Sequence, residues 1–218
     1  MRDDPDLSFE RRLWRSGLRS VAGLDEAGRG ALAGPVAVGA VILPGGARRG
    51  GNSLPELLRG VRDSKQMTPA GREEAAPRIK TTAVAWAVGF ASAQEIDADG
   101  IVAATRLAAM RALAELGLYP DYLLTDFRLE LPELDIPQTA LVKGDAHCLS
   151  IAAASVLAKT ARDALLCEMD AQVPGYGLAR HKGYGTRSHL LALQCQGYSP
   201  VHRKSFTIKS NAKSVDTF

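Results

Sequence analysis

The stretch VAGLDEAGRG, residues 21–30, runs from apolar residues into two adjacent acids and then an arginine between two glycines. A second apolar run, 35–43, follows a loop of small residues, so the two runs predict a pair of strands joined by that loop. A charge that enters a protein core costs on the order of several kcal/mol unless it is paired or bound to a metal ion. The position of Asp25 and Glu26, directly after a buried strand, therefore needs an explanation.

The hydrophobic pattern on either side predicts an α/β chain. Apolar runs indicate further strands and helical spacing indicates helices, at 81–92, 121–126 and 139–146 for the strands and at 7–16, 97–116, 147–172 and 186–196 for the helices. Strands followed by helices in this order predict one mixed sheet. The run 81–92 is apolar on both faces, so we expect a strand covered on both sides, with Trp86 in the core.

Prolines and glycines set other boundaries. We expect a helix capped by Thr68 with Pro69 at its first position, and an end or a kink of that helix at Pro77. Residues 44–60 are rich in Gly and Pro and predict a surface loop.

Composition limits the class of protein. A chain of 218 residues has room for one full core but is short for two equal domains. The three cysteines include no CxxC pair, which argues against a zinc or redox site. The N-terminal residues lack a signal-peptide pattern and no run of about 18 apolar residues occurs, so we expect a cytoplasmic protein with no membrane contact.

Charge is distributed unevenly along the chain. The formal net charge is only +3, but no acid occurs from 171 to 215. That segment holds a set of basic residues: Arg180, Lys182, Arg187, Arg203, Lys204, Lys209 and Lys213, with His181, His189 and His202 among them. It predicts a positive surface that would suit nucleic acid, or else a solvated basic face without a partner.

Two more acids, Asp126 and Asp145, also follow apolar runs. Ligands of open α/β sheets gather at the carboxyl ends of adjacent parallel strands, so Asp25, Asp126 and Asp145 can converge there, with Glu26 beside them. The alternative for each acid is a turn or helix cap exposed to water. Oxygen ligands without histidine or thiolate favour magnesium or manganese, and a pair of such ions about 4 Å apart suits phosphodiester hydrolysis.

Three short motifs add candidate binding residues. The glycines of Gly28-Arg29-Gly30 allow a close backbone approach to a ligand, although GRG is also common as a turn with a solvated arginine. HKGYGT, 181–186, presents Tyr184, which can stack on a sugar or base or can cover the edge of the core. Lys65 in DSK either contacts a phosphate or forms a surface ion pair.

Together these motifs resemble the ribonuclease HII family, the bacterial type 2 ribonucleases H. The matching stretches are GLDEAGRGALAGPVAVGAVIL, RDSKQMTPAGREE, LVKGDAHCLSIAAASVLAKTARD, HKGYGT and SPVHRKSF. The resemblance implies a ribonuclease H-like fold: a five-stranded mixed sheet flanked by helices, in one catalytic domain over 1–206. Its helical C-terminal part would cover about 147–206, and 207–218 would form a tail.

The resemblance also implies roles for residues. Four carboxylates, Asp25, Glu26, Asp126 and Asp145, would hold two divalent ions, Mg²⁺ or Mn²⁺. The backbone of Gly28, Arg29 and Gly30 would read the 2′-OH of a ribonucleotide, Tyr184 would stack on the next sugar, and Lys65 would contact a phosphate. Phe127, after the third acid, stands where many members carry a small residue.

The function implied is an endoribonuclease that cuts the RNA strand of RNA/DNA hybrids and nicks duplex DNA 5′ to embedded ribonucleotides, leaving 3′-hydroxyl and 5′-phosphate ends. A junction-resolving nuclease of the same fold is an alternative, but it needs no reader of the 2′-OH. A non-catalytic hybrid-binding module is another, but it would not need all four acids.

The expected partners are RNA/DNA hybrid and DNA that contains ribonucleotides, bound by a monomer. The tail is a candidate for contact with a DNA clamp, although SNAKSVDTF shows no clear docking motif. Repair of misplaced ribonucleotides and removal of primers both remain open as cellular roles.

Overall fold

The computed structural model describes residues 4–45, 53–126 and 129–207, and its centre is one five-stranded sheet. The strand order is β3-β2-β1-β4-β5, with bounds β1 Val21–Ala27, β2 Val36–Ile42, β3 Ala85–Ala91, β4 Tyr122–Asp126 and β5 Gln138–Leu141. The first three strands pair antiparallel, whereas β1, β4 and β5 run parallel. The sheet is therefore mixed, as predicted.

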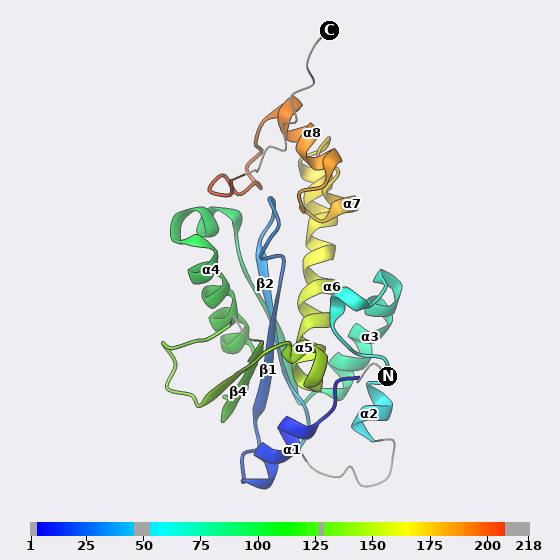
Figure 1. Cartoon of the computed structure of the whole chain (residues 1–218), viewed down its shortest axis with the longest axis vertical. Coiled ribbons are helices and arrows are strands. Elements are labelled where there is room, and N and C mark those ends of the chain that lie inside the picture. Colours follow the sequence, from blue (N-terminus) through cyan, green and yellow to red (C-terminus); the bar gives the residue numbers. More distant parts are fainter. Residues whose placement is uncertain (1–3, 46–52, 127–128, 208–218) are drawn as a thin grey trace.

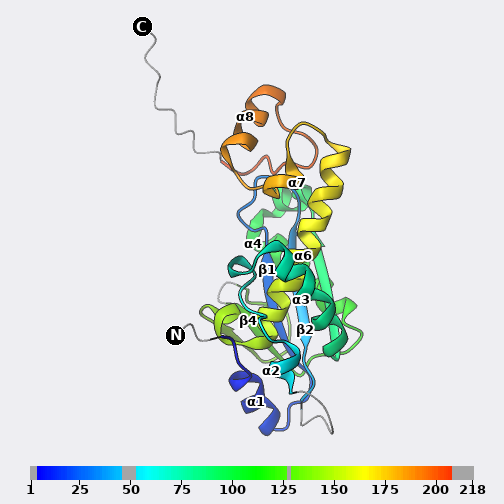
Figure 2. The ribbon, with the colours of Figure 1, turned by 90° about the vertical axis from the view of Figure 1, so that its right-hand side faces the viewer.

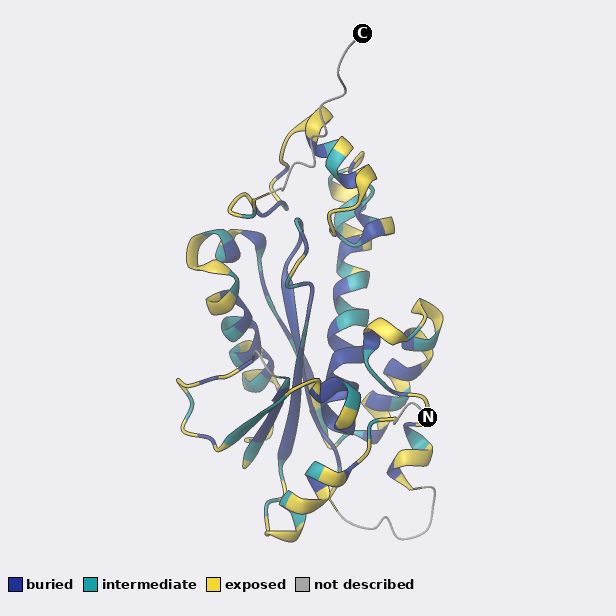
Figure 3. Ribbon diagram, in the orientation of Figure 1, coloured by how far each residue is buried: buried dark blue, intermediate teal, exposed yellow. Residues whose placement is uncertain are grey.

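Helices cover both faces of this sheet (Figure 1). Their bounds are α1 Ser8–Arg15, α2 Leu54–Leu57, α3 Pro69–Thr82, α4 Ala93–Glu115, α5 Gly144–His147, α6 Leu149–Gln172, α7 Leu178–His181 and α8 Arg187–Gln196, with a 3-10 turn η1 at Ser64–Gln66. α4 packs on one face, and α6, backed by α3, packs on the other. The two central strands are buried almost throughout (Figure 3).

α6 lies unusually close to the sheet because glycines face it. A Cβ on Gly39 would lie 2.3 Å from the backbone oxygen of Ala154, and one on Gly23 would lie 2.3 Å from the backbone of Ser150. The long helix can therefore run along β1 and β2 from one end of the sheet to the other. Its C-terminal half, with α7 and α8, forms the end of the molecule opposite α1 (Figure 2).

The third strand differs from the prediction. β3 is an edge strand with alternating burial, and Trp86 is 38% exposed under the Lys80 ammonium, 4.4 Å from the ring centroid. The expectation of a strand covered on both sides with Trp86 in the core is wrong. An edge strand can carry apolar residues on its outer face, and the run of residues does not reveal its place in the sheet.

Two boundary predictions also need correction. Thr68 caps α3 by accepting a hydrogen bond from the N–H of Gly71, as expected, but the helix continues through Pro77 to Thr82. Within the expected loop 44–60, the described residues include the short helix α2, with Ser53 and Glu56 forming a reciprocal cap. Local caps and the packing of α3 against α6 outweigh the proline and glycine signals.

The last strand is shorter than predicted. β5 ends at Leu141, and Asp145 lies instead in the first turn of α5. Lys143, with φ 55°, makes the left-handed turn that separates the two elements. The acid still follows a strand, but it is held by a helix.

Among the described residues, no helix combines the length and the apolar character needed to cross a membrane. Phe127 and the tail from residue 208, with Lys209 and Lys213, lie outside the described residues.

Candidate active site

Three of the four predicted acids converge at the carboxyl ends of β1 and β4. Leu24 pairs with Thr125 in the parallel ladder, so Asp25 and Asp126, the next residue on each strand, lie side by side. One carboxylate oxygen each from Asp25, Glu26 and Asp126 lies within 4.8 Å of the others. The expectation that parallel strands bring these acids together is confirmed.

Asp145 lies next to this group but outside the set of three. The N–H of Gly144, the residue before it, donates to Asp126 Oδ1 at 2.9 Å, which ties α5 to the end of β4. Lys65 Nζ lies 3.9 Å from Asp145 Oδ2 and keeps its side chain largely exposed. The structure therefore places the predicted lysine at the rim of the acids.

Asp63, which the sequence pairs with Lys65 in DSK without giving it a role of its own, also lies at the site. It accepts a hydrogen bond from the backbone of Lys65, and its charge, after burial, is the next largest influence that raises the pKa of Asp145, to about 6. Its signal in the sequence is DSK, where an acid two residues before a candidate phosphate-binding lysine can belong to the same site.

Burial and mutual repulsion dominate the electrostatics of the cluster. Burial, followed by the charge of Glu26, raises the pKa of Asp25 well above its usual range, and hydrogen bonding with the Ser155 side chain offsets part of this rise. Burial also raises the pKa of Glu26. The same acids act on Lys65: burial lowers the pKa of its ammonium, but the nearby carboxylates outweigh burial and raise it. The cluster therefore strongly favours the binding of a positively charged group beside its carboxylates.

The cluster also offers free ligand atoms. Asp25 Oδ2 and Glu26 Oε2 are buried and have no hydrogen-bond partner among the described residues. Buried carboxylate oxygens are normally paired, and oxygen atoms that converge without a donor are the ligands that hard divalent cations prefer. The residues present therefore fit a divalent metal ion.

The two glycines of the GRG loop have different physical reasons. Gly28 has φ +86°, and a Cβ there would lie 1.9 Å from Arg162 Nε, so the fold itself requires glycine. Gly30 has no positive φ, and a Cβ there would meet nothing within 4 Å. Between them, Arg29 Nη1 lies 3.7 Å from Glu26 Oε1. Only Gly30 leaves open space that the fold does not fill.

Two buried arginines hold this loop against the C-terminal part. Arg162 was not singled out in the sequence, and Arg203 was expected on the basic surface instead. Arg162 donates to the carbonyls of Pro35, Ala33 and Lys182, and Arg203 donates to those of Gly34 and Arg29. Among the described residues neither forms an ion pair with a carboxylate. Burial, with the charge of Arg162, lowers the pKa of Arg203 to about 9.

Tyr184 lies on the same side of the molecule as the GRG loop, because Arg162 touches both. The residue is 37% exposed, and the Arg162 and Lys159 cations lie 5.6 Å and 5.4 Å from its ring centroid. Part of Tyr184 is therefore open to a substrate, while its stacking role stays a prediction.

The predicted basic surface is smaller than the sequence indicated. Arg180, Arg187 and Lys204 are exposed and Lys182 is half-buried. Arg203 and the three histidines His181, His189 and His202 are buried instead. Composition alone does not distinguish basic residues that face solvent from those that tie segments together.

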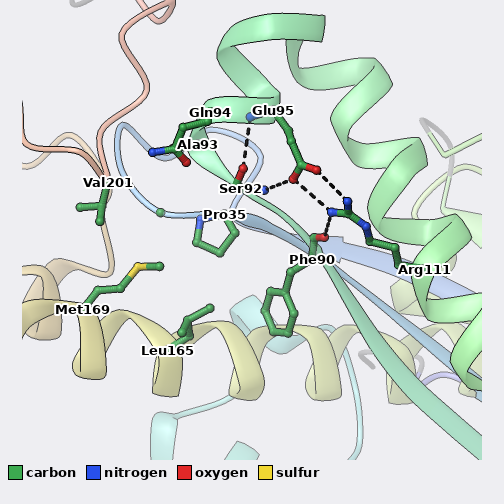
Figure 4. Close-up of a pocket in the computed structure, with 11 residues that line it drawn as sticks. Pro35, Phe90, Ser92, Ala93, Gln94, Glu95, Arg111, Leu165, Met169 and Val201 are labelled. Carbon is green, nitrogen blue, oxygen red and sulfur yellow. Dashed lines mark hydrogen bonds and ion pairs between the residues drawn. The ribbon is translucent and has the colours of Figure 1, made fainter. Parts of the chain in front are cut away.

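An apolar cavity of about 250 Å³ lies elsewhere, between α4, α6 and the loop that carries Pro35 (Figure 4). Its one charged pair, Glu95 and Arg111, is already satisfied by two hydrogen bonds of 2.7 Å and 3.0 Å. None of the four predicted acids lines it, so the chemistry belongs to the carboxylate cluster.

The sequence model of the family described as Ribonuclease HII matches residues 22–209. The chain belongs to this family. Curated members named Ribonuclease HII include one from Synechococcus sp. (strain JA-3-3Ab), 53% identical over 93% of this chain and 88% of that protein. Another, from Moorella thermoacetica, is 51% identical over 91% and 92%. The family hydrolyses RNA in RNA/DNA hybrids, so the chain is an endoribonuclease and not a binding module.

Solved structures agree in fold. The ribonuclease H2 of Pyrococcus horikoshii OT3 matches with a TM-score of 0.68 at 24% identity, covering 86% of this chain and 93% of that one. The PCNA:RNase HII complex from Archaeoglobus fulgidus matches with a TM-score of 0.70 at 23% identity, covering 91% and 100%. The fold is the ribonuclease H-like α/β fold, as the resemblance implied.

Proposed function

We propose that this endoribonuclease, besides cutting the RNA strand of hybrids, nicks duplex DNA on the 5′ side of an embedded ribonucleotide and leaves 3′-hydroxyl and 5′-phosphate ends. The observation that carries the proposal is the convergence of Asp25, Glu26 and Asp126, with two unpartnered buried oxygens, beside a glycine loop with open space at Gly30. Chemistry and a reader of the ribose would thus lie side by side.

Asp25, Glu26, Asp126 and Asp145 would hold two divalent ions, Mg²⁺ or Mn²⁺. Bst-RNase HIII, which matches with a TM-score of 0.57 at 20% identity, has been solved in complex with Mn²⁺ and supports this choice of ion. Bound ions of this kind supply an activated water and stabilise the leaving oxygen. The four carboxylates would bind and orient the ions. Because the pKa values of Asp25 and Asp145 are raised, metal binding would release protons from these groups.

The remaining predicted residues would determine which phosphodiester bond is cut. The backbone of Gly28, Arg29 and Gly30 would contact the 2′-OH, the group that distinguishes RNA from DNA. Tyr184 would stack on the sugar of the next nucleotide and favour a deoxyribose there. Lys65, at the rim with an exposed ammonium, would contact a phosphate.

A panel of substrates tests the proposal. Wild type and Asp25→Asn are compared on a long RNA/DNA hybrid, a DNA duplex with one ribonucleotide, and a four-way DNA junction, all with Mg²⁺. We expect wild type to cut the first two and not the junction, and Asp25→Asn to bind both with little change while cutting neither. Cleavage of the junction, or of hybrid but not of the single ribonucleotide, would reject the proposed specificity.

We also propose that the enzyme acts as a cytoplasmic monomer in a single catalytic domain over 1–206, and that the tail after Phe206 contacts a DNA clamp. The complex of an archaeal ribonuclease HII with PCNA supports the clamp contact. Surface plasmon resonance with an immobilised clamp tests it, comparing the full chain with a chain truncated after Phe206. Equal affinity of the two chains would exclude the tail.

A further inference from the structure

Three histidines lie together in the C-terminal part, next to the backbone of Tyr184. His189 is fully buried, His202 is 1% exposed, and His181 is 9% exposed. His181 stacks on His189 with ring centroids 4.3 Å apart, and His189 Nε2 lies 3.0 Å from His202 Nε2. The proposed cleavage reaction uses none of these three side chains.

Backbone groups at the two ends fix the direction of the hydrogen bonds between them. The N–H of Ser199, 3.1 Å from His202 Nδ1, can only donate, so this nitrogen is the acceptor and carries no proton. The Ser199 hydroxyl, 2.7 Å from the same nitrogen, then acts as a donor too. A neutral His202 then bears its proton on Nε2 and donates to His189 Nε2. His189 in turn carries its proton on Nδ1 and donates to the Tyr184 carbonyl at 3.0 Å.

This chain holds only while both imidazoles are neutral. A proton added to His189 Nε2 would face the N–H of His202. A proton on His202 Nδ1 would face the N–H of Ser199 and would require the Ser199 hydroxyl to turn and accept it. Burial lowers the pKa of His189, and burial with the charge of His189 lowers that of His202 to about 4.

Basic side chains lie against the Tyr184 ring and follow or flank two of the histidines in sequence. Arg162 and Lys159 lie against the Tyr184 ring, Lys182 and Arg180 flank His181 in sequence, and Arg203 follows His202. The charged groups that lower the pKa values of His189 and His202 are the histidines themselves: His181 acts on both, and His189 acts on His202.

We propose that His202 and His189 are positioning residues for Tyr184, in which a chain of neutral imidazoles fixes the Tyr184 carbonyl and thereby the ring that reads the substrate. The proposal rests on the proposed role of Tyr184. The carbonyl otherwise accepts only the N–H of Thr186 among the described residues, at 2.8 Å, and the Tyr184 N–H donates to His181. The imidazole of His189 is thus the side-chain contact that ties the Tyr184 carbonyl to the buried interior. The two preceding carbonyls have other partners, since Arg162 donates to Lys182 and the backbone of Leu32 and Ala33 donates to Gly183.

The first test measures the protons directly. Long-range ¹H–¹⁵N spectra of the full chain report the tautomer of each histidine. We expect His202 to carry its proton on Nε2 and His189 on Nδ1, unchanged from pH 8 to pH 5.5, and His202→Leu to release His189 into a mixture of tautomers. Charged imidazoles at pH 7, or the opposite tautomers, would overturn the proposal.

The second test measures function. The quantity is junction preference, the cleavage rate with a deoxyribonucleotide after the ribonucleotide divided by the rate with a second ribonucleotide there. His189→Leu should lower it about fivefold, the effect of one lost hydrogen bond. His189→Asn, whose amide can still donate from the position of Nδ1, should largely retain it. In a Tyr184→Ala background, His189→Leu should change it no further.

The outcomes separate the two proposals. If Tyr184→Ala leaves junction preference unchanged, the proposed role of Tyr184 is wrong and the functional half of this inference fails with it, while the tautomers still decide the hydrogen-bond chain. If Tyr184→Ala lowers the preference but His189→Leu slows both substrates equally, the histidines only support the fold.

Discussion

At the scale of single residues, two glycines of one short loop are held for different reasons. Gly28 is required by its positive φ and by the Arg162 side chain against it, whereas Gly30 faces open space. A loop glycine that the fold does not need is best explained by a ligand that comes close to its backbone.

Gly30→Ala should therefore leave stability unchanged and slow cleavage at a ribonucleotide. A methyl group where the substrate backbone approaches would displace it, and a displacement of about 1 Å can cost on the order of 100-fold in rate. Thermal unfolding and single-turnover cleavage check the two parts. Gly28→Ala is the matched variant and should lower the unfolding temperature; a Gly30→Ala protein with full activity would remove the loop from the proposed reader.

A second prediction concerns Asp145, whose pKa is raised from 3.8 to about 6, chiefly by burial and by the charge of Asp63. Between these pH values the folded state binds more protons than the unfolded state, so this group lowers stability as pH rises. In EDTA, the free energy of unfolding of Asp145→Asn relative to wild type should therefore increase by about 1–2 kcal/mol from pH 4 to pH 7, allowing for solvent screening.

Urea unfolding at both pH values measures this difference. Mg²⁺ should reverse it, since the ion stabilises the wild-type carboxylates more than the variant. A gap between the two proteins that does not change with pH would show that Asp145 titrates normally.

At the scale of secondary-structure elements, α3 contains a proline that does not stabilise the helix. Pro77 is exposed in the helix interior, where proline lacks the N–H that bonds the carbonyl four residues earlier. The interior placement is a local conflict that the packing of α3 on α6 overrides.

Pro77→Ala should stabilise the protein by about 1–3 kcal/mol, because the new N–H can complete the helix and no buried contact is lost. Urea unfolding checks it. Pro69→Ala, at the first helical position, is the control and should change stability little, since no intrahelical partner exists there. A loss of stability on Pro77→Ala would mean that the ring makes a contact the helix depends on.

The elements also show what the sequence can predict. β1, β2 and β4 were predictable because apolar runs bounded by glycine or acids mark buried strands, and the parallel pairing of β1 with β4 then brought Asp25 and Asp126 together. The exposure of Trp86 was not predictable, since the place of a strand in its sheet is a property of pairing. β5 ends before Asp145 because the chain makes a left-handed turn at Lys143, and a lysine in the sequence does not predict such a turn.

At the scale of the whole molecule, the glycine loop and the C-terminal part are joined through buried guanidinium groups. Arg162 and Arg203 reach carbonyls more than a hundred residues away in sequence. Such contacts leave no local pattern, so the sequence predicted a positive surface where the structure has an internal connection.

Arg203→Met should lower the free energy of unfolding by about 2–4 kcal/mol, because the Gly34 and Arg29 carbonyls lose their donors. Urea unfolding measures it. Lys204→Met, the exposed neighbour, is the control and should change stability by no more than about 0.5 kcal/mol. Equal effects of the two variants would show that the buried arginine is not a structural link.

Across the whole molecule, the carboxylate cluster that would hold the metal ions lies next to the glycine loop, so cleavage should occur where that loop contacts a ribose. The most direct measurement is single-turnover cleavage of an end-labelled DNA duplex with one ribonucleotide, in EDTA and after addition of Mg²⁺, with the cut position mapped. We predict one nick, 5′ to the ribonucleotide, only with Mg²⁺, and absent in Asp25→Asn. A nick in EDTA, a cut on the 3′ side, or full activity of Asp25→Asn would contradict this mechanism.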